Sequence, residues 1–143
     1  MAVFNSEKTA ESYAIPQLFC GDEMGLLDTI NHHYPELWKW YKEMKSLDWS
    51  EDEFDFAKCL PDFENGDPNV VDMMVKTLLW QWEADSVASR APAPLIAPFC
   101  SSTDLWCAEL RITDNECVHG ATYSEIANSA HLSLIHISEP TRL

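Results

Sequence analysis

The sequence NECVHGATYSEI, which spans residues 115–126, places Glu116, His119 and Tyr123 at intervals of three and four residues. At about 100° per residue, these three side chains lie within about 60° of one another on one face of a helix. Four further residues share that face: Leu105, Glu109, Ile112 and Ile126. Because the face is largely apolar, we expect it to point into a helical core.

Local helix signals recur earlier in the chain. Pro35 is typical of the first turn of a helix, and apolar residues follow it at helical spacing. Ser50 and Glu53 have the spacing of a capping box, which predicts a short helix through Phe56.

A long helix is predicted to start at Asp67 and Pro68 and to run to about Ser89. Its apolar stripe consists of Val71, Met74, Val75, Leu78 and Trp82. Asp85 falls on the same stripe, where a carboxylate is costly unless it is paired, hydrogen-bonded or bound to a metal. The alternative is that Asp85 lies at a solvent margin near the helix end.

Two proline-containing segments separate the predicted helices. Residues 61–66 are expected to form a loop, and the sequence RAPAPLIAPF at 90–99 is expected to form a connector. Ser101 or Ser102 then caps the last long helix, which is predicted to run to Ile126 or slightly beyond. Strand signals are nearly absent, so the sequence predicts an all-α fold.

Composition narrows the possible functions. The chain has 143 residues, 46% of them apolar, which is enough for a core. A net charge of −15 and the lack of any Lys or Arg cluster disfavour nucleic-acid binding. No apolar run is long enough to span a bilayer, and the five cysteines form no C-x-x-C pair and follow no recognisable signal peptide. We expect a soluble, cytoplasmic protein with reduced thiols and an extended arm over residues 1–15.

The spacing of Glu116 and His119 suggests metal chemistry. Burying a glutamate beside a histidine is reasonable if a cation binds both, and Glu-x-x-His on a bundle helix is the ligand pattern of ferritin-like di-iron and di-manganese proteins. Asp85 offers a third ligand, and Tyr123 lies one turn beyond the histidine. The alternative for the Glu-x-x-His pair is a solvated glutamate beside a histidine with satisfied hydrogen bonds.

The sequences EADSVASRAPAPL at 83–95 and NECVHGATYSEI resemble the two metal-binding segments of class I ribonucleotide reductase small subunits. The segments PQLFCG and GLLDTI resemble the N-terminal arm and first helix of that family. LDWSEDEFD at 47–55 resembles its F-W-x-P-E-E segment. The resemblance extends from about Val3 to Ile126.

This resemblance implies a role for each matching residue. Asp85, Glu116 and His119 would bind the iron nearest the radical, with Glu116 also bridging to the second metal. Tyr123 would hold the stable tyrosyl radical, and Trp49 would belong to the electron- and radical-transfer path. Trp49 as a plain core aromatic and Tyr123 as a packing residue remain alternatives.

The resemblance also implies the wider context. The complete protein would be a ferritin-like helical bundle with a di-iron centre, with manganese left open. It would act as the small subunit of ribonucleoside-diphosphate reductase, form a homodimer, and pass its radical to the large subunit for deoxyribonucleotide synthesis.

Ile112 and Asp114 depart from the aromatic residues that the family often has one turn before the glutamate. Gly120 weakens its helix by about 1 kcal/mol relative to alanine.

Only the N-terminal half of such a bundle is recognisable. No second Glu-x-x-His follows, since neither His131 nor His136 has a glutamate three residues before it. Residues 1–126 are interpreted as the N-terminal part of the reductase domain. Residues 127–143 are interpreted as a non-native or artefactual tail, in which LSLIHISEPTR at 132–142 resembles a translated sequencing adapter. The alternative is a natural tail with a short apolar run that ends at Pro140. We therefore expect this chain alone to be inactive and loosely folded.

Two other functions are open at this stage. The chain is also compatible with another ferritin-like di-iron oxidase, which would have no need for a tyrosine at position 123. A metal-free, acidic helical interaction module is the second alternative. That module would leave the inward carboxylates without a stabilising partner.

Overall fold

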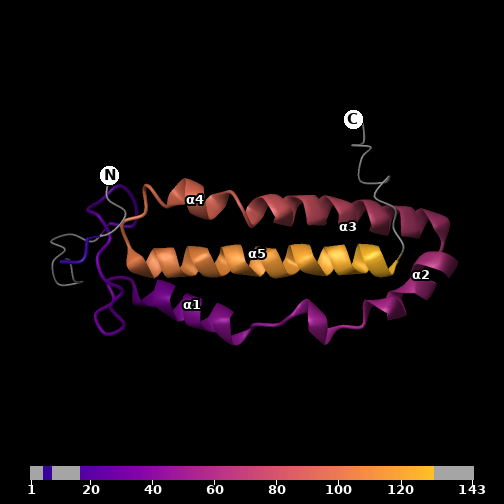
Figure 1. Ribbon diagram of the computed structural model, residues 1–143, viewed down its shortest axis with the longest axis horizontal. Helices are drawn as coiled ribbons and strands as arrows, with labels where there is room; N and C mark the ends of the chain where they lie inside the picture. The colour runs from indigo at the N-terminus through magenta and orange to yellow at the C-terminus, as the bar shows by residue number, and fades with distance from the viewer. Residues whose placement is uncertain (1–4, 8–16, 131–143) are drawn as a thin grey trace. The chain divides into compact units, whose positions relative to one another are not determined.

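The computed structural model describes residues 5–7 and 17–130, and the described chain is all-α (Figure 1). Its helices are α1 (Pro35–Ser46), α2 (Leu60–Asn65), α3 (Pro68–Ala88), α4 (Pro92–Ile96) and α5 (Thr103–Ser129), with two short 3-10 helices, η2 (Glu51–Glu53) and η3 (Phe56–Cys59). Extended pairing within the described residues is limited to an isolated antiparallel bridge between Phe19 and Cys100. The prediction of an all-α fold is confirmed, as are the starts of α1, α3 and α5. No helix in the described part of the chain has the length and apolar character needed to cross a membrane.

The chain divides into two compact units. Unit 1 comprises residues 1–48 and 89–115, and unit 2 comprises residues 49–88 and 116–143. Helix α5 contributes its first half to unit 1 and its second half to unit 2. The predicted tail falls mostly on residues 131–143, and most of the predicted extended arm falls on residues 1–4 and 8–16. Those residues lie outside the described part of the chain, whereas residues 127–129 of the predicted tail form the end of helix α5.

Two segments predicted as irregular contain short helices instead. Residues 61–66 were expected to form a loop, but helix α2 occupies Leu60–Asn65. The connector at 90–99 likewise contains helix α4. Both helices have proline in their first turn, where the backbone N–H groups have no intrahelical acceptor and a proline loses nothing. The prediction failed because it read the prolines of these two segments as breakers, although the first-turn role expected for Pro35 and Pro68 applies to them as well.

The capping box forms as predicted, but the helix behind it is shorter. The Ser50 hydroxyl accepts from the Asp52 amide, and the Ser50 amide donates to Glu53 Oε1 at 3.0 Å. The cap starts only the single 3-10 turn η2, which ends where Phe54 adopts an extended conformation. A continuous helix through Phe56 was therefore a wrong prediction.

Unit 1 has a small apolar core at the start of helix α5. Its buried residues are Met24, Cys100 and Leu105, and Leu18, Leu37, Ile96 and Trp106 pack against them. The Leu105 amide donates to Ser102 Oγ at 3.4 Å, so Ser102 is the cap of α5. Ser101 instead accepts a hydrogen bond from the Gly21 amide at 2.6 Å. Of the two serines considered from the sequence, Ser102 performs the capping.

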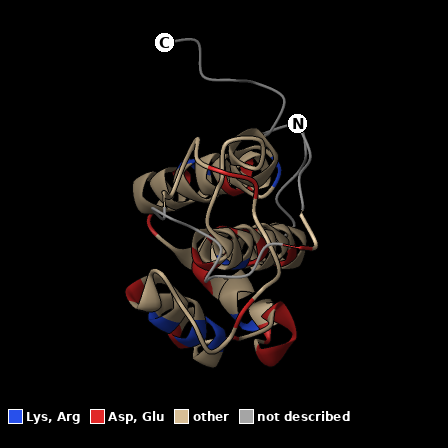
Figure 2. Ribbon diagram, turned by 90° about the vertical axis from the view of Figure 1, so that its left-hand side faces the viewer, with Lys and Arg blue, Asp and Glu red and all other residues tan. Residues whose placement is uncertain are grey.

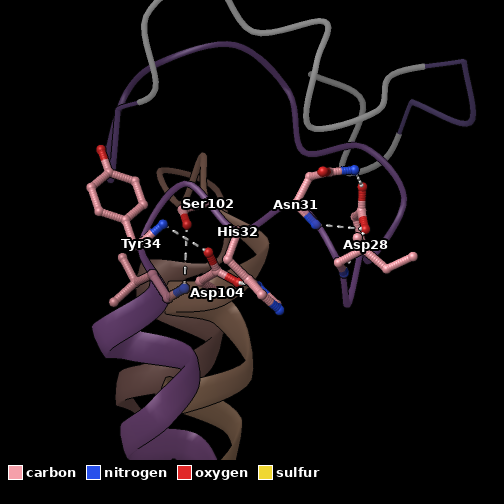
Figure 3. A network of polar contacts seen from close by, with 8 residues as sticks. Asp28, Asn31, His32, Tyr34, Ser102 and Asp104 are labelled. Carbon is pink, nitrogen blue, oxygen red and sulfur yellow. Dashed lines mark hydrogen bonds and ion pairs between the residues drawn. The ribbon is translucent and has the colours of Figure 1, made fainter.

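A buried polar network joins the segment before α1 to the first turn of α5 (Figure 3). Asp104 is 4% exposed; its Oδ1 lies 2.6 Å from His32 Nδ1, and its Oδ2 accepts from the Tyr34 amide at 3.0 Å. The His32 ring stacks on Trp38 with ring centroids 4.7 Å apart. A carboxylate at this place also interacts favourably with the N-terminal end of the helix dipole. Asp104 therefore anchors two segments of unit 1.

In unit 2, helix α3 and the second half of α5 lie side by side (Figure 1). A Cβ atom added at Gly120 of α5 would lie 3.9 Å from Ser86 Oγ of α3, which is ordinary van der Waals contact. Most of the predicted inner stripe of α3 is partly buried, but Met74 is exposed. On α5, Ile112 is also exposed rather than in a core. These two apolar residues were wrongly placed in the core because periodicity defines a face without saying how much of it is covered.

Removal of the Asp104 carboxylate should open the network in unit 1. In Asp104→Ala, we expect the Tyr34 amide to exchange with solvent at least about tenfold faster, because a hydrogen bond to a charged group contributes about 1.5–3 kcal/mol. Amide hydrogen exchange followed by NMR measures this directly. Glu125→Ala, an exposed change on the same helix, is the matched control. Equal exchange rates for Tyr34 in the two variants would contradict the anchoring role.

The two glycines of unit 2 at positions 66 and 120 should respond oppositely to alanine. Gly120→Ala should stabilise the protein by about 1 kcal/mol, because the helix gains propensity and the new methyl group has room. Gly66→Ala should destabilise it, since the Cβ atom would lie 2.5 Å from the Asp62 carbonyl oxygen. Urea denaturation followed by circular dichroism compares the two. A destabilising Gly120→Ala would show that α3 and α5 approach more closely than described.

Candidate metal centre

All five site residues predicted from the sequence belong to unit 2. Asp85 lies in the last turn of α3, and Glu116, His119 and Tyr123 lie on the second half of α5. Trp49 lies directly before the capping box of η2. The structure therefore places residues that are far apart in sequence within one unit.

Asp85, Glu116 and His119 converge on one point. One potential ligand atom from each lies within 4.8 Å of the other two. His119 Nδ1 is 3.3 Å from Glu116 Oε2 and 3.8 Å from Asp85 Oδ2. Two ligands about 2.1 Å from a shared ion at a tetrahedral angle are about 3.4 Å apart, so these separations suit a cation of that size. Within the described residues, no other group of three or more His, Cys, Asp or Glu side chains meets the same condition.

The group is only partly buried. The side chains of Asp85, Glu116 and His119 are 19%, 24% and 40% exposed. The two carboxylates are thus largely withdrawn from water, while one side of the imidazole remains open. The sequence predicted an inward face and the convergence of these groups, but not the open side.

The negative charge of Glu116 disfavours the ionised form of Asp85. Partial burial raises the pKa of Asp85, the negative charge of Glu116 raises this pKa further, and His119 opposes the rise. In the absence of a cation, the ionised form of Asp85 is therefore less favourable than that of a free aspartate. A bound cation would reverse this balance, because it interacts with the ionised carboxylates.

The other basic side chains described in unit 2 are engaged elsewhere. Lys58 lies 3.6 Å from Asp55, and Lys76 lies 2.7 Å from Asp72. Both pairs are exposed and join residues three or four positions apart on their own segments. Over the whole sequence, acidic residues outnumber Lys and Arg by 24 to 9, and the acidic residues among the described ones are drawn red in Figure 2. Among the described residues of this unit, His119 is therefore the basic group that lies close enough to offset the charge of Asp85 and Glu116.

Tyr123 is a partly buried neighbour of the same carboxylates. Burial raises the pKa of its phenol, and the charges of Asp85 and Glu116 raise this pKa further. The phenol therefore keeps its proton at neutral pH.

Trp49 contacts the histidine of the group. Its ring stacks on His119 with centroids 6.0 Å apart and planes inclined by 27°. Phe54 meets Trp49 edge-on at 5.7 Å. The sequence singled out Trp49 through the family resemblance but gave no reason to expect either ring contact, because both depend on how the chain after α1 folds against its neighbours.

Comparison of the chain with family models and with curated protein sequences gave no match. The assignment of a function therefore rests on the geometry of this group and on the residues that carry the family resemblance.

Replacement of Asp85 should stabilise the metal-free protein but remove the stabilisation that added Fe(II) gives. In metal-free protein at neutral pH, Asp85→Asn should raise the thermal midpoint, because it removes the charge that Glu116 opposes. Added Fe(II) should raise the midpoint of the unmodified chain but not that of the variant, since a ligand that binds only the folded state stabilises it. Circular dichroism against temperature measures both effects.

Glu83→Gln is the matched control for this experiment, because Glu83 is an exposed carboxylate two residues away on the same helix. Its response to Fe(II) should equal that of the unmodified chain. If Fe(II) stabilises Asp85→Asn and the control equally, Asp85 is not a ligand.

Proposed function

We propose that this chain is the N-terminal part of the small, radical-generating subunit of a class I ribonucleoside-diphosphate reductase. The observation that carries the proposal is the convergence of Asp85, Glu116 and His119 with Tyr123 and Trp49 beside them. These are the residues that match the family's motifs in order and type. A cytoplasmic location and a homodimeric complete subunit belong to the same proposal.

Asp85, Glu116 and His119 would hold one metal of the di-iron centre, with manganese as the other candidate. The chemistry of the donor set fits, because two carboxylate oxygens and one imidazole nitrogen suit a divalent first-row metal. When bound, such a centre supplies the oxidising power needed to convert a tyrosine to its radical. His119 presents Nδ1 to the two carboxylates, so this is the nitrogen that would bind.

The protein groups around the metal position have separate tasks. Tyr123 keeps its phenolic proton until it is oxidised, because burial and the charges of Asp85 and Glu116 raise the pKa of the phenol. Trp49 stacks on His119, so the indole is in direct contact with a metal ligand and can pass an electron toward it. In the complete enzyme, this contact would lie on the path that connects the radical to the large subunit.

The described residues supply one half of a dinuclear site. A second Glu-x-x-His and another glutamate would come from further helices of the complete protein, and Glu116 would be among the ligands that hold the metal. The separation of tasks between subunits follows from the chemistry, because a radical made at a metal must be used at a substrate site that has thiols.

The proposal is tested on the full-length, iron-loaded protein. The unmodified protein should show a tyrosyl signal in electron paramagnetic resonance at low temperature. Tyr123→Phe should abolish that signal and leave the iron content unchanged, because the phenol is not a ligand in this assignment. His119→Ala should reduce iron affinity at least about tenfold, since even changes outside the ligand set cost about 10- to 100-fold.

Each other result selects a different function. Iron binding without a tyrosyl signal in the unmodified protein would indicate another ferritin-like oxidase and overturn the reductase proposal. Absent iron binding would indicate the metal-free interaction module, and iron binding that Asp85→Ala leaves unchanged would overturn the assignment of Asp85 as a ligand.

A further inference from the structure

Arg111, which none of the roles above involves, makes a dense set of polar contacts on α5. Its guanidinium donates to Asp114 Oδ2 at 2.7 Å and to Asn115 Oδ1 at 2.7 Å, and it also pairs with Asp48. The Arg111 side chain is 14% exposed, whereas Asp48 and Asp114 are 45% and 61% exposed. The cation is thus largely buried and draws two more exposed carboxylates to it.

The contact with Asp48 differs in kind from the other two. Asp114 and Asn115 lie three and four positions after Arg111, so their contacts stay on one helix. Asp48 is 63 positions away in sequence, and it directly precedes Trp49. The Arg111–Asp48 pair therefore fixes a segment outside the helix to α5.

Trp49 is consequently held from both sides along the chain. On its N-terminal side, Asp48 pairs with Arg111. On its C-terminal side, Ser50 is fixed by the capping box with Glu53. A residue between two anchored neighbours has little freedom to move, and its side chain keeps a narrow range of positions.

We propose that Arg111 is a positioning residue, whose pair with Asp48 holds the Trp49 indole against the His119 ring. Arg111 and His119 lie eight positions apart on the same helix, which corresponds to a rise of about 12 Å. Asp48 pairs with Arg111, and Trp49, the next residue in the chain, stacks on His119. The positioning follows from these contacts, whereas its value for electron delivery rests on the proposed function.

The chemistry explains why arginine suits this position. A planar guanidinium has five N–H donors in fixed directions and can bind several acceptors at once, which an ammonium group does less well. The pair with Asp48 is half-exposed, so its main effect is on geometry and not on stability. The expected consequence of breaking it is a displaced Trp49 in a chain that is still folded.

The test uses metal-free protein labelled with fluorotryptophan and observed by fluorine NMR. The Trp49 resonance is assigned by its absence in Trp49→Phe, and His119→Ala gives its position without the ring stack. We expect Asp48→Asn and Arg111→Met to move the Trp49 resonance in the same direction, at least half of the way to its position in His119→Ala. Arg111→Lys, which keeps the charge, should displace the Trp49 resonance less than Arg111→Met does.

Asp114→Asn is the matched control, because it removes a carboxylate from the same guanidinium without touching Asp48. Its Trp49 resonance should not move. If Arg111→Met lowers the helix content in far-UV circular dichroism, Asp48→Asn carries the test alone, since Asp48 is on the surface. A Trp49 resonance that stays in place in Asp48→Asn and moves in His119→Ala would overturn the proposal.

The test of the positioning role and the test of the proposed function can fail independently. The NMR measurement requires no metal, so it can succeed in a chain that binds none. Fe(II) affinity should be unchanged in Arg111→Met, because Arg111 is not a ligand. A chain that fails to bind iron but shows the expected Trp49 shifts would leave the positioning role intact and overturn the function.

Discussion

The close approach of two carboxylates on neighbouring helices is the constraint on which the rest of this structure depends. Asp85 on α3 and Glu116 on α5 face the same imidazole nitrogen and are largely withdrawn from water. Burial and Glu116 together raise the pKa of Asp85, so the packing of these helices carries an electrostatic cost at neutral pH. A protein retains such an arrangement when the cost is offset by a bound cation or by a function. The proposed metal centre would supply both the cation and the function.

Much of the helical architecture could be predicted from local signals. The first-turn prolines of α1 and α3 and the Ser102 cap of α5 are encoded within a few residues of each helix start. The same reasoning failed for α2 and α4, where proline was read as an interruption although it occupies the first turn. The His32–Asp104 contact was also missed. Its partners are 72 positions apart, and no local pattern connects them.

In the candidate site, too, some positions follow from local sequence patterns and others depend on contacts between distant segments. The shared face of Glu116, His119 and Tyr123 follows from their spacing on one helix, because helical geometry leaves no other arrangement. The alignment of Asp85 with an apolar stripe indicated that it points toward a neighbour, although not which one. The Trp49–His119 stack could not be predicted in this way, since the position of Trp49 depends on the contacts of Asp48 and Ser50. Periodicity also failed to give the degree of burial, as the exposed Ile112 demonstrates.

Helix α3 is apolar on more than the side that faces α5. Four of its large apolar side chains are between 48% and 68% exposed: Val70, Met73, Trp80 and Val87. A helix that is apolar around most of its circumference is typical of the interior of a larger assembly, because water disfavours each exposed apolar face. The proposed ferritin-like bundle accounts for this feature, since α3 would have neighbours on several sides there. In that setting, the same additional helices that cover α3 would bring the remaining carboxylate and histidine ligands to the metal, so the apolar surface and the half-complete ligand set have one common explanation.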